Sequence, residues 1–67
     1  MAMTLREARE AKKLSQRDVA TIVGRTPQAV SQWESGQSMM PADIFLKLCQ
    51  IYGVSADDII WPKNGHF

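Results

Sequence analysis

Residues 15–36 read SQRDVATIVGRTPQAVSQWESG and contain the signals that decide the fold. Ser15 and Asp18 can form a capping box, in which hydroxyl and carboxylate satisfy each other's otherwise unpaired backbone N–H groups. Gly24 suits the left-handed residue that ends a helix. The sequence between these signals therefore predicts a short helix. Its inward stripe is expected to comprise Val19, Ile22 and Val23.

A second helix follows after a very short link. Thr26 is a suitable cap, and Pro27 suits the first helical position because proline lacks only an N–H that is unpaired there anyway. This helix is expected to run to about Glu34 and to close at Ser35-Gly36. Since only Gly24-Arg25 separates the two helices, the pattern is typical of a tight turn between crossed short helices, the helix-turn-helix motif.

Three further short helices are expected outside this stretch, which gives an all-α, five-helix domain. Thr4 can cap a helix over residues 5–13, and an apolar-faced helix is expected within residues 41–53. A very short fifth helix is expected over residues 55–60, followed by a tail at 62–67. Nowhere does a sustained alternation of β-branched and polar residues predict a sheet.

Length and composition limit the classes of protein that fit. A chain of 67 residues, 45% of them hydrophobic, has room for one core, so residues 1–67 are expected to form one domain with its core at about 4–61. With one cysteine, Cys49, and one histidine, His66, neither an internal disulfide nor a Cys/His zinc site is available. Apolar runs fall far short of the roughly 18 residues of a membrane span. We expect a soluble, cytoplasmic protein that is not an enzyme and has no cofactor, metal or small-molecule ligand.

One face of the predicted helix after Pro27 is polar but uncharged. At about 100° per residue, four side chains fall within one stripe: Gln28, Ser31, Gln32 and Ser35. Amides and hydroxyls offer paired donors and acceptors that match base edges, and glutamine can bond N6 and N7 of adenine in the major groove. An ordinary polar surface is the alternative interpretation. Trp33 lies on the opposite side with Val30 and is expected in the core.

Several segments with fixed spacing follow the same order along the chain: LSQRDVA at 14–20, Gly24, VSQWESG at 30–36, Pro41, LKL at 46–48 and GVS at 53–55. Together they resemble the Cro/C1-type helix-turn-helix family, also called XRE-like, which includes the DNA-binding domains of lambdoid phage repressors and many small bacterial regulators. The resemblance covers residues 5–60. It implies a lambda-repressor-like fold of five helices whose third helix enters the major groove of double-stranded DNA.

The resemblance also implies a role for individual residues. The base-facing positions are matched by Gln28, Ser31 and Gln32. Phosphate contacts are expected from Gln16, Arg17, Arg25, Thr26, Ser35 and Gln37. Gln16 matches the glutamine that grips the DNA backbone, where the helix N-terminus also favours a phosphate. Arg25 departs from the small residue usual in the family, but a cation exposed in the turn can still contact a phosphate.

Arg9 and Glu34 match a pair of residues that the family often joins as a structural tie. The arginine belongs to the first helix and the glutamate ends the recognition helix. Taking both charges out of water is costly unless they meet, and removal of one partner leaves the other buried and unpaired. Arg9 is therefore expected to stabilise the fold and is left out of the DNA contacts.

A second copy of the chain is a further expected partner. Some of the stretch Ile59, Ile60 and Trp61 must close the core, but the two aromatics after the last helix, Trp61 and Phe67, exceed what so small a domain needs to hide. An exposed apolar patch usually marks a partner surface. One recognition helix reads only about half of a typical operator, and a twofold dimer places two of them roughly 34 Å apart. We expect a weak homodimer joined through these residues and formed fully on DNA. Alternatively, Trp61 folds back on its own core.

The net charge of +1 hides two unlike parts of the chain. Residues 1–33 carry six basic and three acidic side chains, whereas residues 34–67 carry two basic and four acidic ones. Attraction to a nucleic-acid backbone is therefore expected to be modest. The expected function is a sequence-specific, Cro-like phage or prophage repressor in a bacterial cytoplasm. An antitoxin-type protein-interaction module and the controller protein of a restriction–modification system are the alternatives on the same fold.

Overall fold

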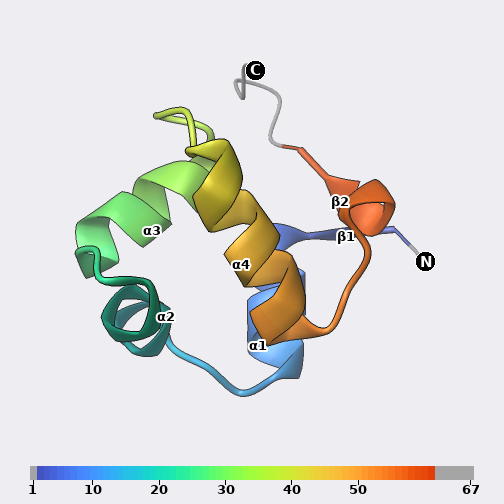
Figure 1. The fold of residues 1–67 in the computed structure, drawn as a ribbon, viewed down its shortest axis with the longest axis horizontal. Coiled ribbons are helices and arrows are strands. Elements are labelled where there is room, and N and C mark those ends of the chain that lie inside the picture. Colours follow the sequence, from blue (N-terminus) through green and yellow to red (C-terminus); the bar gives the residue numbers. More distant parts are fainter. Residues whose placement is uncertain (1, 62–67) are drawn as a thin grey trace.

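The computed structural model describes residues 2–61, and the expected tail at 62–67 lies outside this range. The elements, in order, are β1 (Met3–Thr4), α1 (Leu5–Ala11), α2 (Gln16–Val23), α3 (Pro27–Ser35), α4 (Ala42–Tyr52), a 3₁₀ turn (Ala56–Asp58) and β2 (Ile59–Ile60). Figure 1 shows α2 and α3 on one side of α4, with the two short strands on the other. The described residues are thus mostly helical, with four α-helices.

Capping boxes start both α1, where Thr4 is the predicted cap, and α2, where Ser15 and Asp18 form the predicted box. The Thr4 hydroxyl accepts the backbone N–H of Glu7 at 3.1 Å, and the Glu7 carboxylate accepts that of Thr4 at 2.8 Å. Ser15 and Asp18 make the same reciprocal bonds at 3.0 and 2.9 Å. These bonds lower the pKa of the Asp18 carboxyl because they stabilise its charged form. Both helix starts are therefore fixed by residues three positions apart.

The turn between α2 and α3 has the predicted chemistry. Gly24 ends α2 at φ 72°, a left-handed conformation that costs a side chain-bearing residue energy. The Arg25 N–H then donates to the Ala20 carbonyl at 2.9 Å. The Thr26 hydroxyl accepts the Ala29 N–H at 3.1 Å, which caps α3. The helix-turn-helix is thus closed by a backbone bond on the α2 side of a very short link and by a side-chain cap on the α3 side.

The fifth helix predicted over residues 55–60 is not an α-helix, and a short 3₁₀ helix takes part of its place. Ala56–Asp58 form a single 3₁₀ turn, in which the Ser55 hydroxyl accepts the N–H of Asp57 at 3.4 Å. Ile59–Ile60 then become β2, which pairs in parallel with β1 in the register Met3 to Ile59 and Thr4 to Ile60. Two β-branched residues in succession favour extended backbone. The two ends of the described chain are thereby joined by a minimal sheet, which the all-α expectation did not include.

The first helix is also shorter than predicted. It ends at Ala11, and Lys13 adopts a left-handed conformation at φ 58°. The Lys13 N–H donates to the Glu10 carbonyl at 2.9 Å, and the Leu14 N–H donates to the Arg9 carbonyl at 3.3 Å. This is the bonding of a helix end that usually has glycine at the left-handed position. A lysine there is a strained substitute.

The core draws apolar side chains from all four helices and β2, and its largest fully buried members are Ile44, Leu48, Val19 and Val30. Trp33 belongs to it, as predicted. The inward position predicted for Ile22 is wrong, because this side chain is 56% exposed. Ala20 takes the inward place at 1% exposed. It and Ile22 lie about equally far from the middle of the Val19 and Val23 stripe, on opposite sides, so helical periodicity alone does not decide between them. No helix within residues 2–61 is long and apolar enough to cross a membrane.

Candidate nucleic-acid interface

The third helix turns its uncharged polar stripe outward. Gln28, Ser31 and Ser35 are exposed, and Gln32 is half-buried. On the other side of α3, Val30 and Trp33 are 1% and 6% exposed. The three predicted base-reading side chains therefore project from one rigid helix whose opposite face is fixed in the core.

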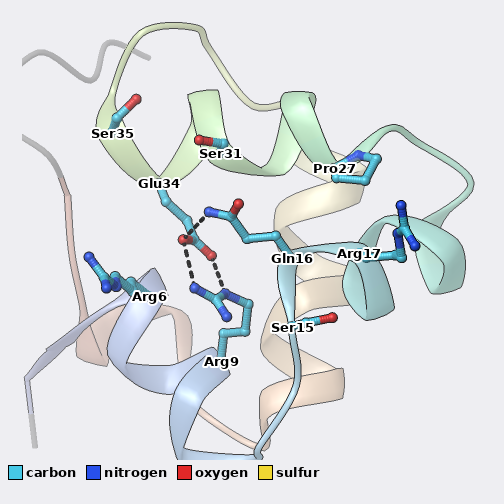
Figure 2. Close-up of a pocket in the computed structure, with 9 residues that line it drawn as sticks. All are labelled: Arg6, Arg9, Ser15, Gln16, Arg17, Pro27, Ser31, Glu34 and Ser35. Carbon is cyan, nitrogen blue, oxygen red and sulfur yellow. Dashed lines mark hydrogen bonds and ion pairs between the residues drawn. The ribbon is translucent and has the colours of Figure 1, made fainter.

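Beside this helix lies an open hollow of about 710 Å³ between α1, the start of α2 and α3. Figure 2 shows α3 along one wall of the hollow, with α1 and the start of α2 facing it. The lining includes four of the predicted DNA contacts, which are Gln16, Arg17, Ser31 and Ser35. Thus residues from two helices that are separated by a turn meet at one concave surface.

Arg9 and Glu34 form an ion pair in the middle of the hollow (Figure 2). Arg9 Nε lies 2.7 Å from Glu34 Oε2, and Nη2 lies 3.2 Å from Oε1. The remaining terminal nitrogen of Arg9, Nη1, donates to the Leu14 carbonyl at 2.8 Å. The two side chains are only 9% and 7% exposed, and the hydrogen bond to Glu34 raises the pKa of Arg9. The pair joins α1 to α3 and leaves neither charge unsatisfied.

Gln16 is tied to this pair. Its amide nitrogen, Nε2, donates to Glu34 Oε1 at 3.1 Å, across the gap between α2 and α3. A glutamine amide has two N–H donors, so one bond to Glu34 leaves the second available for a phosphate oxygen. The predicted phosphate contact at Gln16 is therefore oriented by the same carboxylate that holds Arg9.

The other predicted phosphate contacts lie at the two ends of α3, outside the hollow. Arg25 is exposed in the turn, and its Nη1 donates to the Gly24 carbonyl at 3.3 Å. The Thr26 hydroxyl caps α3 through its oxygen, which leaves its proton free to donate. Gln37 is exposed just beyond α3. These groups flank the outward polar stripe on both sides.

Arg6 also lines the hollow, although sequence analysis did not assign it to the site. Its guanidinium is exposed and pairs with Glu10 on the same helix at 3.2 Å. The signal was present in the spacing, because Arg6 precedes Arg9 by three residues and side chains so spaced share one face of a helix. Residues 2–61 hold no group of three His, Cys, Asp or Glu side chains placed to bind a metal ion.

The three residues expected at a dimer interface have different environments. Ile59 is 7% exposed and belongs to the core of its own chain, whereas Ile60 is 49% exposed. Trp61 is half-buried, and its ring lies against Phe45 of α4 with centroids 4.6 Å apart. The alternative in which Trp61 folds back on its own core is thus partly realised, and Ile60 is the most exposed of the three.

Comparison with known families agrees with this geometry. A helix-turn-helix family model matches residues 5–59, from the start of α1 to the first residue of β2. No curated protein sequence and no solved structure matches the chain. The matched range includes α2, the turn, α3 and the Arg9–Glu34 pair. The chain therefore belongs to the Cro/C1-type (XRE-like) helix-turn-helix family of DNA-binding transcription regulators.

Proposed function

We propose that the protein is a sequence-specific, Cro-like repressor that binds operator DNA as a homodimer, with α3 in the major groove. The observation that carries the proposal is the outward stripe of α3, with Gln28 and Ser31 exposed and Gln32 half-buried. A helix fits the major groove, and glutamine amides can bond adenine N6 and N7 there. Occupation of a site that overlaps a promoter blocks polymerase.

The hollow beside α3 gives the complex its register. Phosphate contacts position a protein on the duplex, while base contacts specify the sequence. We place the DNA backbone along the hollow, where Gln16 and Arg17 at the start of α2 and Ser35 at the end of α3 meet it. Arg25, Thr26 and Gln37 contact phosphates beyond the ends of α3. Because the hydrogen bond to Glu34 orients Gln16, the residue that sets the position of the protein along the DNA is itself held in place by the fold.

The dimer is proposed around the C-terminal end of the described chain. Ile60 leaves about half of a large apolar side chain in water, and Trp61 lies beside it with its ring against Phe45. A second copy that covers this surface removes apolar area from water. Two copies also supply the two recognition helices that a symmetric operator requires.

Selection of bound sequences from a library of random duplexes tests the proposal. The expected result is a twofold-symmetric consensus with half-site centres about 10 base pairs apart. The double variant Gln28→Ala/Gln32→Ala is expected to lose this consensus. Gln50→Ala, which removes an exposed amide from α4, is the matched control and is expected to keep it. Absence of any enriched sequence for the unmodified protein would contradict the proposal.

A further inference from the structure

Two guanidinium groups stand on opposite sides of the hollow. Arg6 comes from α1 and Arg17 from the start of α2, and Figure 2 shows the Arg9–Glu34 pair between them. The Arg6 side chain is 69% exposed, so it can turn toward a ligand without disturbing the core. Arg17 is exposed as well. The two cations can therefore reach one extended anion from two helices.

The charge of the hollow favours such an anion. Glu34 supplies the carboxylate in its lining, and both oxygens already accept hydrogen bonds, one from Arg9 and the other from Arg9 and Gln16. With this carboxylate neutralised, the cations at the two sides of the hollow remain to attract an anion. An open hollow of about 710 Å³ is far larger than a single phosphate group. It suits a length of duplex backbone that runs past α3.

In the structure, the Arg6 guanidinium forms an ion pair with the carboxylate of Glu10. Arg6 Nε lies 3.2 Å from Glu10 Oε2, one helical turn away, and both side chains are more than half exposed. Exposed pairs of this kind are weak, because water and salt screen them. A phosphate oxygen can therefore replace the carboxylate at little cost.

We propose that Arg6 is a further phosphate-binding residue and that Glu10 competes with the DNA backbone for it. The inference rests on the proposed function, because it places the backbone in the hollow while α3 lies in the major groove. Arg6 then adds a contact from a third element, α1, which restricts the angle at which α2 and α3 approach the duplex. Glu10 lowers the affinity for any duplex, so more of the binding energy depends on base reading.

Binding to a duplex of random sequence at several salt concentrations tests the role of Arg6 without knowledge of the operator. Arg6→Ala is expected to weaken binding several-fold and to reduce the salt slope by about 1, as for loss of one phosphate contact. Lys12→Ala is the matched control, since it removes one positive charge from the C-terminal end of the same helix. The Lys12 amine lies beside Gly53, at the end of α4 and away from the hollow. Lys12→Ala is expected to leave the salt slope unchanged.

Glu10→Gln tests the competition. It is expected to raise affinity for the random duplex in the unmodified protein and to have a much smaller effect in the Arg6→Ala background. A general change of charge raises affinity equally in both backgrounds, and that result would overturn the role of Glu10. Equal slopes and affinities for Arg6→Ala and Lys12→Ala would overturn the role of Arg6.

Arg17→Ala separates failure of this inference from failure of the proposed function. If Arg17→Ala weakens binding and Arg6→Ala does not, the backbone follows the hollow without α1, and only the inference about Arg6 is wrong. If the unmodified protein shows neither salt-dependent duplex binding nor a selected consensus, both the inference and the proposed function are wrong.

Discussion

The carboxylate of Glu34 on α3 is held by the guanidinium of Arg9 on α1 through two hydrogen bonds, of 2.7 and 3.2 Å. Both side chains are more than nine-tenths buried, and the carboxylate also accepts a bond from Gln16 on α2. One carboxylate thus fixes the mutual positions of the three helices that surround the hollow. The pair is structural, yet it determines the position of the Gln16 amide, which is a predicted phosphate contact.

Removal of one partner of this pair is expected to cost more stability than removal of both. Glu34→Gln leaves a buried guanidinium without its counter-charge, so the free energy of unfolding should fall by about 3–5 kcal/mol. Arg9→Met/Glu34→Leu replaces the pair with apolar groups of similar size and should cost clearly less. Urea unfolding of both variants measures the difference. A double variant at least as unstable as Glu34→Gln would show that the pair stabilises the fold by its attraction.

The parts of the fold that were predictable depend on local chemistry. Capping boxes join residues three apart, and the glycine and proline signals on either side of Arg25 act on their own backbone, so the helix-turn-helix followed from the sequence. The polar stripe of α3 also follows from helical periodicity alone. The Arg9–Glu34 pair joins residues 25 positions apart and was expected only through the family resemblance.

The parts that were not predictable depend on distant packing. The two strands are two residues long, too short for any periodic pattern, and each exists because the other end of the chain lies beside it. The three-residue spacing of Arg6 and Arg9 indicates a shared helix face, but that this face lines the hollow beside α3 depends on how α1 packs. The exposure of Ile22 follows from the choice of Ala20 as the inward residue, which apolar character alone does not indicate.

Lys13→Gly is expected to stabilise the protein. Lys13 is the non-glycine residue with positive φ among residues 2–61, at 58°, and a left-handed conformation costs an L-residue roughly 1–2 kcal/mol. Part of this gain is offset because glycine loses more backbone entropy on folding, so a net gain of about 0.5–1 kcal/mol is expected. Thermal unfolding measures it as a rise in Tm of several degrees. Lys13→Ala is the control and should give no gain; equal Tm values for the two variants would contradict the account.

Tyr52 should make stability depend on pH in the alkaline range. It is 2% exposed, and burial, aided by the negative charge of Glu34, raises its pKa to about 12. The unfolded chain has a tyrosine pKa of about 10, so the unfolded state loses its proton first. The stability that the protonated Tyr52 hydroxyl contributes is therefore complete below pH 10 and is lost as the pH rises through about 12. A difference of two pKa units between the folded and unfolded states corresponds to roughly 2–3 kcal/mol in the free energy of unfolding.

Tyr52→Phe isolates this effect because phenylalanine cannot ionise. Urea unfolding between about pH 9 and pH 12 should show a steeper fall in stability for the unmodified protein than for the variant. The comparison uses the slopes, since loss of the hydroxyl can shift both curves by a constant amount. Parallel curves over this range would show that the hydroxyl ionises as easily in the folded chain as in the unfolded one.

Loss of Gln28 or Gln32 on α3 should change the base preference of DNA binding, whereas loss of Arg25 in the turn should change the affinity for every duplex. Gln28→Ala or Gln32→Ala is expected to cost about 1–3 kcal/mol at particular base pairs and to relax the preference there. Arg25→Ala is expected to weaken binding to all duplexes alike and to reduce the salt dependence. Affinities for a selected site and its single-base variants measure both effects. Uniform losses for the glutamine variants would show that these side chains do not read bases.

Ile60→Asp should reduce self-association more sharply than a change at Trp61. The Trp61 ring packs on Phe45, so its removal disturbs the fold as well as any interface, whereas Ile60 is 49% exposed. A carboxylate at position 60 must lose its hydration when a second copy covers it, which disfavours the dimer. Ile22→Asp is the matched control, since Ile22 is 56% exposed on α2.

Sedimentation at several concentrations, with and without a selected duplex, measures these dimerisation effects. For the unmodified protein and for Ile22→Asp, two copies are expected per symmetric site, with self-association rising with concentration. For Ile60→Asp, the expected result is a monomer in the absence of DNA and weaker, less cooperative occupation of the site in its presence. Because a symmetric site can bind two copies that do not touch, cooperativity is the decisive quantity. Unchanged cooperativity in Ile60→Asp would move the dimer contact away from the C-terminal end of the described chain.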